Sequence, residues 1–170
     1  MIRKQLLIAL GMLAAVAVCL IVARIGLSAP QPAVDIGVAE RLALAVRWLL
    51  VPGFCLLVGL GFTANRRFLS ADAIDGGPPK GPGAFEINLR YNTNTLEQTV
   101  LAAIAWTGLA LTLQRQDLGL IPALAGLFAA GRAAFWLGYL YAPWARAFGL
   151  GLTFYPTIAA FVWLALQAAR

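Results

Sequence analysis

Long uninterrupted apolar runs constrain this chain more than any other feature of its sequence. They cover residues 6–27, 42–64, about 86–113, 118–141 and about 148–168. Since about 20 apolar residues in a helix cross a hydrocarbon core of about 30 Å, each run is long enough to span a bilayer. The runs are continuous and do not alternate in polarity every second residue, so they predict transmembrane helices rather than the strands of a membrane barrel.

Composition supports the same class of protein. Hydrophobic residues make up 61% of the 170 residues and charged residues 12%, whereas soluble domains have about 45–50% and about 25%. We therefore predict an all-α polytopic membrane protein with two parts. Residues 1–41 form an N-terminal transmembrane anchor helix and its connector, and residues 42–170 form a four-helix membrane domain. The first run exceeds a signal-peptide core in length and is followed by Pro30, which favours a retained anchor.

Several kinds of chemistry are excluded. The chain has no histidine, so His-based catalytic pairs and His-ligated metals are not available, and we expect no metal site. Cys19 and Cys55 lie within apolar runs, where we expect small buried side chains rather than a disulfide. The 13 Lys and Arg are scattered between the spans, which argues against nucleic acid as a partner.

Basic residues also predict an orientation. Alternate sides of the five spans would carry unequal numbers of them: Arg3, Lys4, Arg66, Arg67, Lys80 and Arg146 on one side, and Arg41, Arg115 and Arg170 on the other. By the positive-inside rule the richer side is cytoplasmic. The N-terminus, the loop 65–84 and the turn 141–147 are then cytoplasmic, and we expect a bacterial inner membrane.

The third span opens with an unusually polar segment. Arg90, Asn94 and Glu97 fall at i, i+4 and i+7 and therefore share one helical face. Glu97 lies roughly 16 Å along the axis from Glu86, which places its carboxylate within the hydrocarbon layer. An ionisable group at that depth needs a partner or a wet cavity. The segment is either a structural Arg90–Glu97 ion pair or the polar wall of a cleft between helices.

The fourth span carries a second polar set. Arg132, Phe135 and Tyr139 share a helical face, and Arg132 lies in the middle of the span. A guanidinium at this depth needs a carboxylate, and we expect Glu97 to supply it. Arg146 follows Pro143 at the end of the span, where it could also act as a simple cytoplasmic anchor.

Together these residues resemble the paired signatures of the MAPEG family, the membrane-associated proteins of eicosanoid and glutathione metabolism. The first signature is Phe85-Glu86, Arg90, Asn94 and Glu97, and the second is Arg132, Gly138-Tyr139 and Arg146. The resemblance covers residues from about 42 to the C-terminus, and Arg66-Arg67 matches a basic pair in glutathione-using members. It implies a trimer of four-helix protomers with glutathione between neighbouring subunits. The first span is then an extra N-terminal helix.

The resemblance also implies roles for individual residues. Arg90, Asn94, Glu97 and Tyr139 would hold the peptide part of glutathione, together with Arg132 from the second signature. Arg66 and Asn92 would reach its glycine carboxylate. Arg146 matches the arginine that stabilises the thiolate, since a neighbouring cation favours the anionic sulfur. A lipophilic electrophile or peroxide would arrive from the lipid side. The chain departs from the pattern at Phe135, where members often have tyrosine, and at Gln98, which replaces an aromatic hydroxyl.

Three functions remain open. The first is a membrane-bound glutathione-dependent transferase-like enzyme. The second is a non-catalytic MAPEG-fold subunit with a structural or lipid-binding role, in which Arg90, Glu97 and Arg132 form a buried charge network. The third is a small transporter, because intramembrane charges also mark ion pathways. The chain shows no inverted repeat and no matched pair of broken spans, which argues against a transporter.

Overall fold

The computed structural model describes residues 1–29, 36–71, 73–77, 81 and 83–170. These residues are all-helical: α1 (Ile2–Leu27), α2 (Val38–Phe68), α3 (Ala84–Thr112), a 3-10 turn (Arg115–Asp117), α4 (Leu120–Tyr141) and α5 (Arg146–Ala168). The predicted all-α fold is confirmed. Pro30, Pro32, Asp35 and Lys80, which belong to the two predicted connectors, lie outside the described residues.

Four helical segments of the described chain are long and apolar enough to cross a membrane, and they contain α1, α2, α4 and α5. α3 is equally long, with 29 residues, but it does not reach the same apolarity. The reason is its polar first half, which buries Asn88 and Asn92 against other helices. The predicted third span is therefore present as a long helix, but it is not among the segments that are apolar enough to cross a membrane. The four apolar segments make the protein an integral membrane protein.

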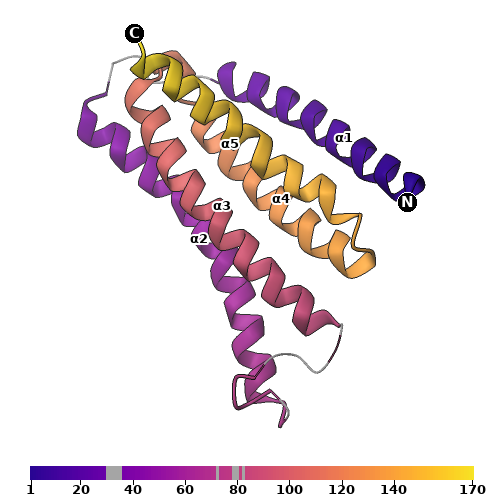
Figure 1. Ribbon diagram of the computed structural model, residues 1–170. Helices are drawn as coiled ribbons and strands as arrows, with labels where there is room; N and C mark the ends of the chain where they lie inside the picture. Colours follow the sequence, from indigo (N-terminus) through magenta and orange to yellow (C-terminus); the bar gives the residue numbers. More distant parts are fainter. Residues whose placement is uncertain (30–35, 72, 78–80, 82) are drawn as a thin grey trace.

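Successive helices run in opposite directions along the bundle (Figure 1). The N-terminus consequently lies at the same end as the α2–α3 connection and the α4–α5 turn, while the C-terminus lies at the other end. α2 packs mainly on α3, and α4 on α5. These four helices form the bundle, and α1 packs outside it against α4 and α5. This is the predicted four-helix bundle with one extra N-terminal helix.

The first three helices begin earlier than the apolar runs alone predict, whereas α4 begins two residues later. α1 and α2 each start four residues before the predicted boundary, and α2 continues to Phe68. Arg66 and Arg67 therefore lie in the last turn of α2 rather than in the loop. Cations are favourable at that position because the carbonyl end of a helix carries partial negative charge.

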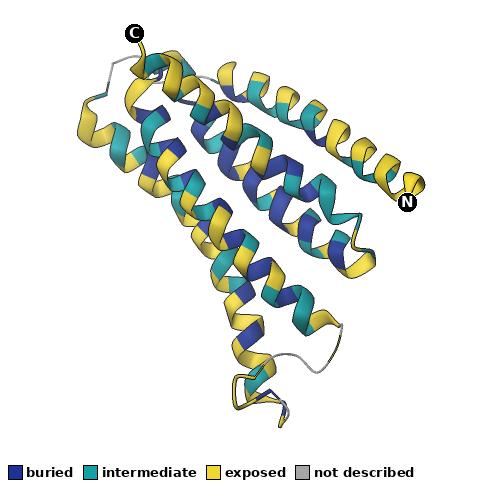
Figure 2. Cartoon of the chain, viewed as in Figure 1, coloured by how far each residue is buried: buried dark blue, intermediate teal, exposed yellow. Residues whose placement is uncertain are grey.

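Close backbone contact joins α4 to α5. A Cβ on Gly149 would meet the backbone of Phe135, and one on Gly131 would lie 2.9 Å from Thr153 Cγ2 and 3.1 Å from the carbonyl oxygen of Gly149. Small residues let two membrane helices approach in this way. As Figure 2 shows, buried positions are most frequent on α3 and α4. The packing of α4 on α5 holds the fully buried Arg132 in place.

α1 is exposed along most of its length (Figure 2). Ala15 is buried where α1 meets the bundle, and it packs on Leu127 and Leu152. Pro156 in α5 has no N–H for the carbonyl of Leu152. Cys19 Sγ lies 4.0 Å from that carbonyl oxygen and donates to it. This cysteine is thus half-buried between two helices, and both Cys19 and Cys55 are free.

Candidate functional site

A polar groove opens between α3, α4 and α5, with a volume of about 410 Å³. The structure brings Arg90, Asn94 and Glu97 together along one wall of it, as their spacing predicts. The other lining residues are Leu89, Thr93, Phe135, Arg146 and Leu150. The groove thus collects charged groups from two helices that are distant in the sequence.

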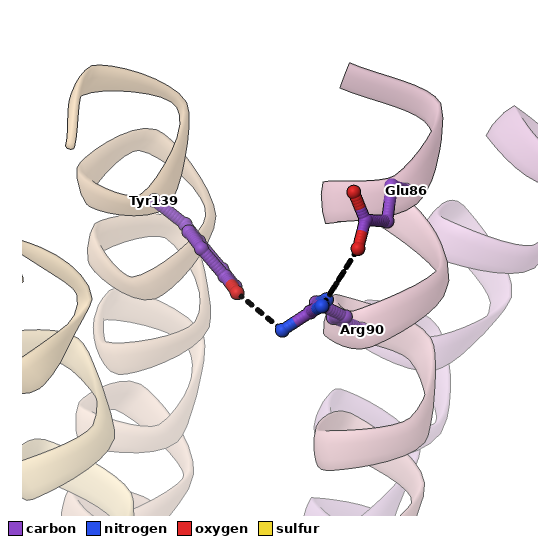
Figure 3. A network of polar contacts seen from close by, with 3 residues as sticks. All are labelled: Glu86, Arg90 and Tyr139. Carbon is purple, nitrogen blue, oxygen red and sulfur yellow. Dashed lines mark hydrogen bonds and ion pairs between the residues drawn. The ribbon is translucent and has the colours of Figure 1, made fainter. Parts of the chain in front are cut away.

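Arg90 links α3 to α4 at the edge of the groove (Figure 3). Its Nη2 lies 2.6 Å from Glu86 Oε1, in an i,i+4 ion pair on the same helix. Its Nη1 donates to the hydroxyl of Tyr139 at 3.2 Å. The Arg90–Glu97 ion pair that the sequence left open is therefore not formed, because Glu86 lies one turn away on the same face and takes the guanidinium.

Arg146 stands on the opposite wall, as the first residue of α5. Its guanidinium carbon lies 4.4 Å from the centre of the Tyr139 ring. A guanidinium over an aromatic face is held by the ring quadrupole while its donors stay free. Among the described residues, no carboxylate lies within ion-pair distance of Arg146, so its charge is available to an anion in the groove.

Arg132 is fully buried behind the groove. Its Nη1 donates to Asn94 Oδ1 at 2.7 Å, and its Nη2 donates to Thr153 Oγ1 at 2.8 Å. The ring of Phe135 lies 4.8 Å from the guanidinium carbon. The predicted Arg132–Glu97 pair is wrong, because the shorter Asn94 lies between the two and neutral acceptors from α3 and α5 hold the guanidinium.

Asn94 also connects Arg132 to the open groove. While its Oδ1 accepts from Arg132, its Nδ2 donates to Glu97 Oε2 at 3.4 Å. Glu97 itself is exposed, and within the described chain its carboxylate has no cationic partner. The groove therefore presents an open carboxylate on α3 and an open guanidinium on α5.

Four of the predicted binding residues do not line the groove. Arg132 lies behind it, and Tyr139 contacts Arg90 and Arg146, which do line it. The other two, Asn92 and Arg66, lie elsewhere. Asn92 faces α2, where its Nδ2 donates to Thr63 Oγ1 at 2.8 Å, and only 8% of the residue is exposed. Asn88 donates to the same hydroxyl at 2.7 Å. Arg66 is exposed at the end of α2. Within one chain, Asn92 therefore joins α2 to α3, and Arg66 lies apart from the other site residues.

The structure also shows where the two residues that depart from the family pattern, Phe135 and Gln98, lie relative to the groove. Phe135 lines the groove and is only 3% exposed. Gln98 is buried and does not line it, and its Oε1 has no partner among the described residues. The change at Phe135 therefore affects the wall of the groove, whereas the change at Gln98 affects the packing of α3.

Sequence reasoning missed Thr153, which holds Arg132, and Leu150, which lines the groove. The spacing of residues in the sequence could have identified both. Leu150 and Thr153 follow Arg146 at i+4 and i+7, which places them on the same face of α5. A threonine in an apolar run, on the same face as a charged residue, indicates a side chain with a polar partner nearby.

Comparison with known proteins agrees with this architecture. The sequence model of the MAPEG family matches residues 42–166. Transmembrane protein 79 of Mus musculus is 35% identical over 115 residues, which are 68% of this chain and 26% of the mouse protein. Transmembrane protein 79 of Bos taurus is 33% identical over 78 residues, which are 46% of this chain and 20% of the bovine protein. The similarity thus spans about a quarter or less of these relatives. No solved structure matches this chain.

Proposed function

This chain belongs to the MAPEG family, and on that premise we propose that it is a membrane-bound, glutathione-dependent transferase-like enzyme. It activates the glutathione thiol for attack on a lipophilic electrophile or peroxide. The observation that carries the proposal is the pair of open charges in the groove, the Arg146 guanidinium and the Glu97 carboxylate. Neither has an ion-pair partner among the described residues, and a ligand with both signs of charge would satisfy them.

Glutathione has the complementary charges. It carries two carboxylates, one ammonium group and a thiol in a short flexible peptide. Glu97 accepts the ammonium group, and the donors of Arg90 that face the groove bind a carboxylate through charge-assisted hydrogen bonds. Asn94, held by Arg132, offers its amide beside Glu97. The second carboxylate needs another cation.

That cation comes from a second subunit. Arg66 is exposed and lies outside the groove of its own chain, so in a homotrimer it would reach the groove of a neighbour. Asn92 is buried against Thr63, and we assign it to the packing of α2 on α3. The complete site is then shared between subunits, with lipid surrounding the trimer.

Arg146 supplies the activation. A guanidinium beside a thiol favours the thiolate, which is the nucleophile. Attack on an activated double bond forms a carbon–sulfur bond, and the proton released by the thiol returns to the neighbouring carbon. With a peroxide, the thiolate takes one oxygen and releases an alcohol, and a second glutathione then yields the disulfide and water. In both reactions, glutathione and the second substrate supply all the atoms and electrons.

A thiolate difference spectrum tests the proposal directly. Glutathione is titrated into the purified detergent-solubilised protein and into the variant Arg146→Ala. Arg170→Ala is the control, because Arg170 lies at the opposite end of α5 from Arg146. We expect a saturable thiolate absorbance with the wild type and Arg170→Ala, and none with Arg146→Ala, while all three elute as the same oligomer. A full signal in Arg146→Ala would overturn the assigned role.

One observation favours a second candidate, a non-catalytic MAPEG-fold subunit with a structural or lipid-binding role. The contacts of Arg132 with Asn94 and Thr153 hold a buried charge without any ligand. If millimolar glutathione gives no thiolate signal with an intact wild-type oligomer, this second function replaces the first.

We also propose the bacterial inner membrane as the location, with the N-terminus and the groove end of the bundle in the cytoplasm. Labelling of a cysteine introduced at Arg66 or at Arg170 by an impermeant reagent tests the orientation. We expect labelling at position 170 in intact cells, and labelling at position 66 only after permeabilisation.

A further inference from the structure

A second cavity lies between the extra helix α1 and the α4–α5 pair. Its volume is about 640 Å³, and it extends along α1 from Val16 to Leu27 and along α5 from Tyr155 to Trp163. The side chains around it are apolar almost throughout, and Asp117 is the one charged residue among the described residues that line it. None of the signature residues of the polar groove lines this cavity.

A smaller cavity of about 200 Å³ lies between the two. It shares Arg146 and Leu150 with the polar groove, and it shares Tyr155 with the large apolar cavity. α1 closes it with Ile8 and Met12. The three cavities therefore follow one another along α5, and the extra helix forms a wall of the two that lead away from Arg146.

The dimensions match those of membrane lipid. Along α1, the distance from Ile8 to Leu27 is about 28 Å at 1.5 Å per residue, close to the thickness of a hydrocarbon core. Val16 to Leu27 covers about 16 Å of this length. An apolar cavity in this environment excludes water and takes up apolar ligands. The molecules that surround it in the membrane are acyl chains.

Charge selects the direction in which such a chain lies. Arg146 lines the two cavities at one end of the series and has no ion-pair partner among the described residues. Asp117 lies at the other end, where its carboxylate repels an anionic head group. A lipid with an anionic or electron-poor head would therefore place its head towards Arg146 and its tail towards Trp163.

We propose that the cavity between α1 and the α4–α5 pair binds the chain of a long-chain acyl lipid, with its head directed along α5 towards Arg146. Binding of the chain is independent of the thiol chemistry, whereas its role as second substrate rests on the proposed function. The extra N-terminal helix then builds the lipid site of this protein.

Photolabelling tests the proposal. The full-length protein in lipid nanodiscs is labelled with a palmitate analogue that carries a diazirine near its tail, with and without excess palmitate, and adducts are mapped by peptide mass spectrometry. We expect competed adducts within residues 16–27 of α1 and 155–163 of α5. Adducts spread evenly over the lipid-facing surface, or labelling that palmitate does not compete, would overturn the proposal.

Matched variants sharpen the experiment. Ala159 lines the cavity, and Ala165 lies on the same helix, exposed and outside it. Because overpacking excludes part of the chain, Ala159→Phe should lower the competed labelling about tenfold, while Ala165→Phe leaves it unchanged. Ala23 lines the cavity from α1, and Ala23→Leu adds a smaller side chain than Ala159→Phe. This second variant replaces Ala159→Phe in the experiment if Ala159→Phe does not fold. Wild-type labelling in both cavity variants would contradict the assignment.

The same samples separate the two proposals. Each preparation is also titrated with glutathione to record the thiolate absorbance. Competed labelling without a thiolate signal would leave the lipid site standing and overturn the proposed function. A thiolate signal without competed labelling would overturn the lipid site and leave the proposed function standing.

Discussion

Nη1 of Arg132 donates a hydrogen bond to Oδ1 of Asn94 at 2.7 Å, so a fully buried cation is held by a neutral amide. The other end of the same amide donates to the exposed Glu97 carboxylate. One asparagine thus joins the interior of the bundle to the groove. Changes on the buried side of this link should affect stability, and changes on the open side should affect ligand binding.

Thr153→Val tests the buried side. The substitution removes an acceptor from the Arg132 guanidinium, so we expect the free energy of unfolding to fall by about 1–3 kcal/mol. Thr157→Val is the control, because Thr157 Oγ1 only donates to the carbonyl of Thr153 on its own helix. It should cost about 0.5–1.5 kcal/mol. Denaturation in detergent compares the two, and equal losses would mean that Thr153 contributes little to holding Arg132.

Glu97→Gln tests the open side. The carboxylate is exposed, and it accepts a hydrogen bond from the Asn94 amide rather than from Arg132 or Arg90. Stability should therefore change by no more than about 0.5 kcal/mol. Glutathione should bind roughly tenfold to a hundredfold more weakly, because its ammonium group loses a charged acceptor. A large loss of stability with no change in binding would favour the structural role.

Tyr139→Phe separates two contacts of one side chain. It removes the hydroxyl that accepts from Arg90 Nη1 but keeps the ring beneath Arg146. Glutathione should bind about threefold more weakly, since one hydrogen bond to a mostly exposed donor is lost. The maximum thiolate absorbance at saturating glutathione should not change. Its loss would show that the hydroxyl itself takes part in activation.

Gly149→Ala tests the contact between α4 and α5. The added methyl group would meet the backbone of Phe135, which cannot move as a flexible side chain can. We expect a loss of about 1–3 kcal/mol from overpacking. Gly126→Ala in α4 is the control, since a Cβ there has no neighbour within 4 Å. It should be neutral or stabilising by about 0.5–1 kcal/mol. Thermal unfolding of both variants in detergent measures the difference.

The sequence predicted the fold well because the membrane leaves few backbone structures open to an apolar segment. Once each backbone polar group must be satisfied inside its own segment, a long apolar run has one solution, a helix. The two signatures identified the family, and helical spacing placed Arg90, Asn94 and Glu97 on one wall of the groove. The ends of the helices were less well predicted, since Arg66 and Arg67 continue α2 beyond its apolar part.

Pairing between helices could not be derived in the same way. Glu97 was the expected partner of Arg132, and a carboxylate is the usual choice for a buried guanidinium. Which acceptor reaches the guanidinium depends on the rotation and depth of α3, α4 and α5 relative to one another. In this structure they place Asn94 and Thr153 within hydrogen-bond distance of Arg132. Asn92 shows the same effect, since its position on α3 turns it towards Thr63 of α2.

By itself, the sequence determined that this is an all-helical membrane protein, because apolar length and helical periodicity are local properties of the chain. Its two signatures identified the MAPEG family. Only the tertiary structure decided which polar groups pair and which remain open, and where α1 lies against α4 and α5. These outcomes follow from packing between segments that are far apart in the chain, such as the approach of Gly149 to Phe135. Such contacts leave no periodic signal in the sequence.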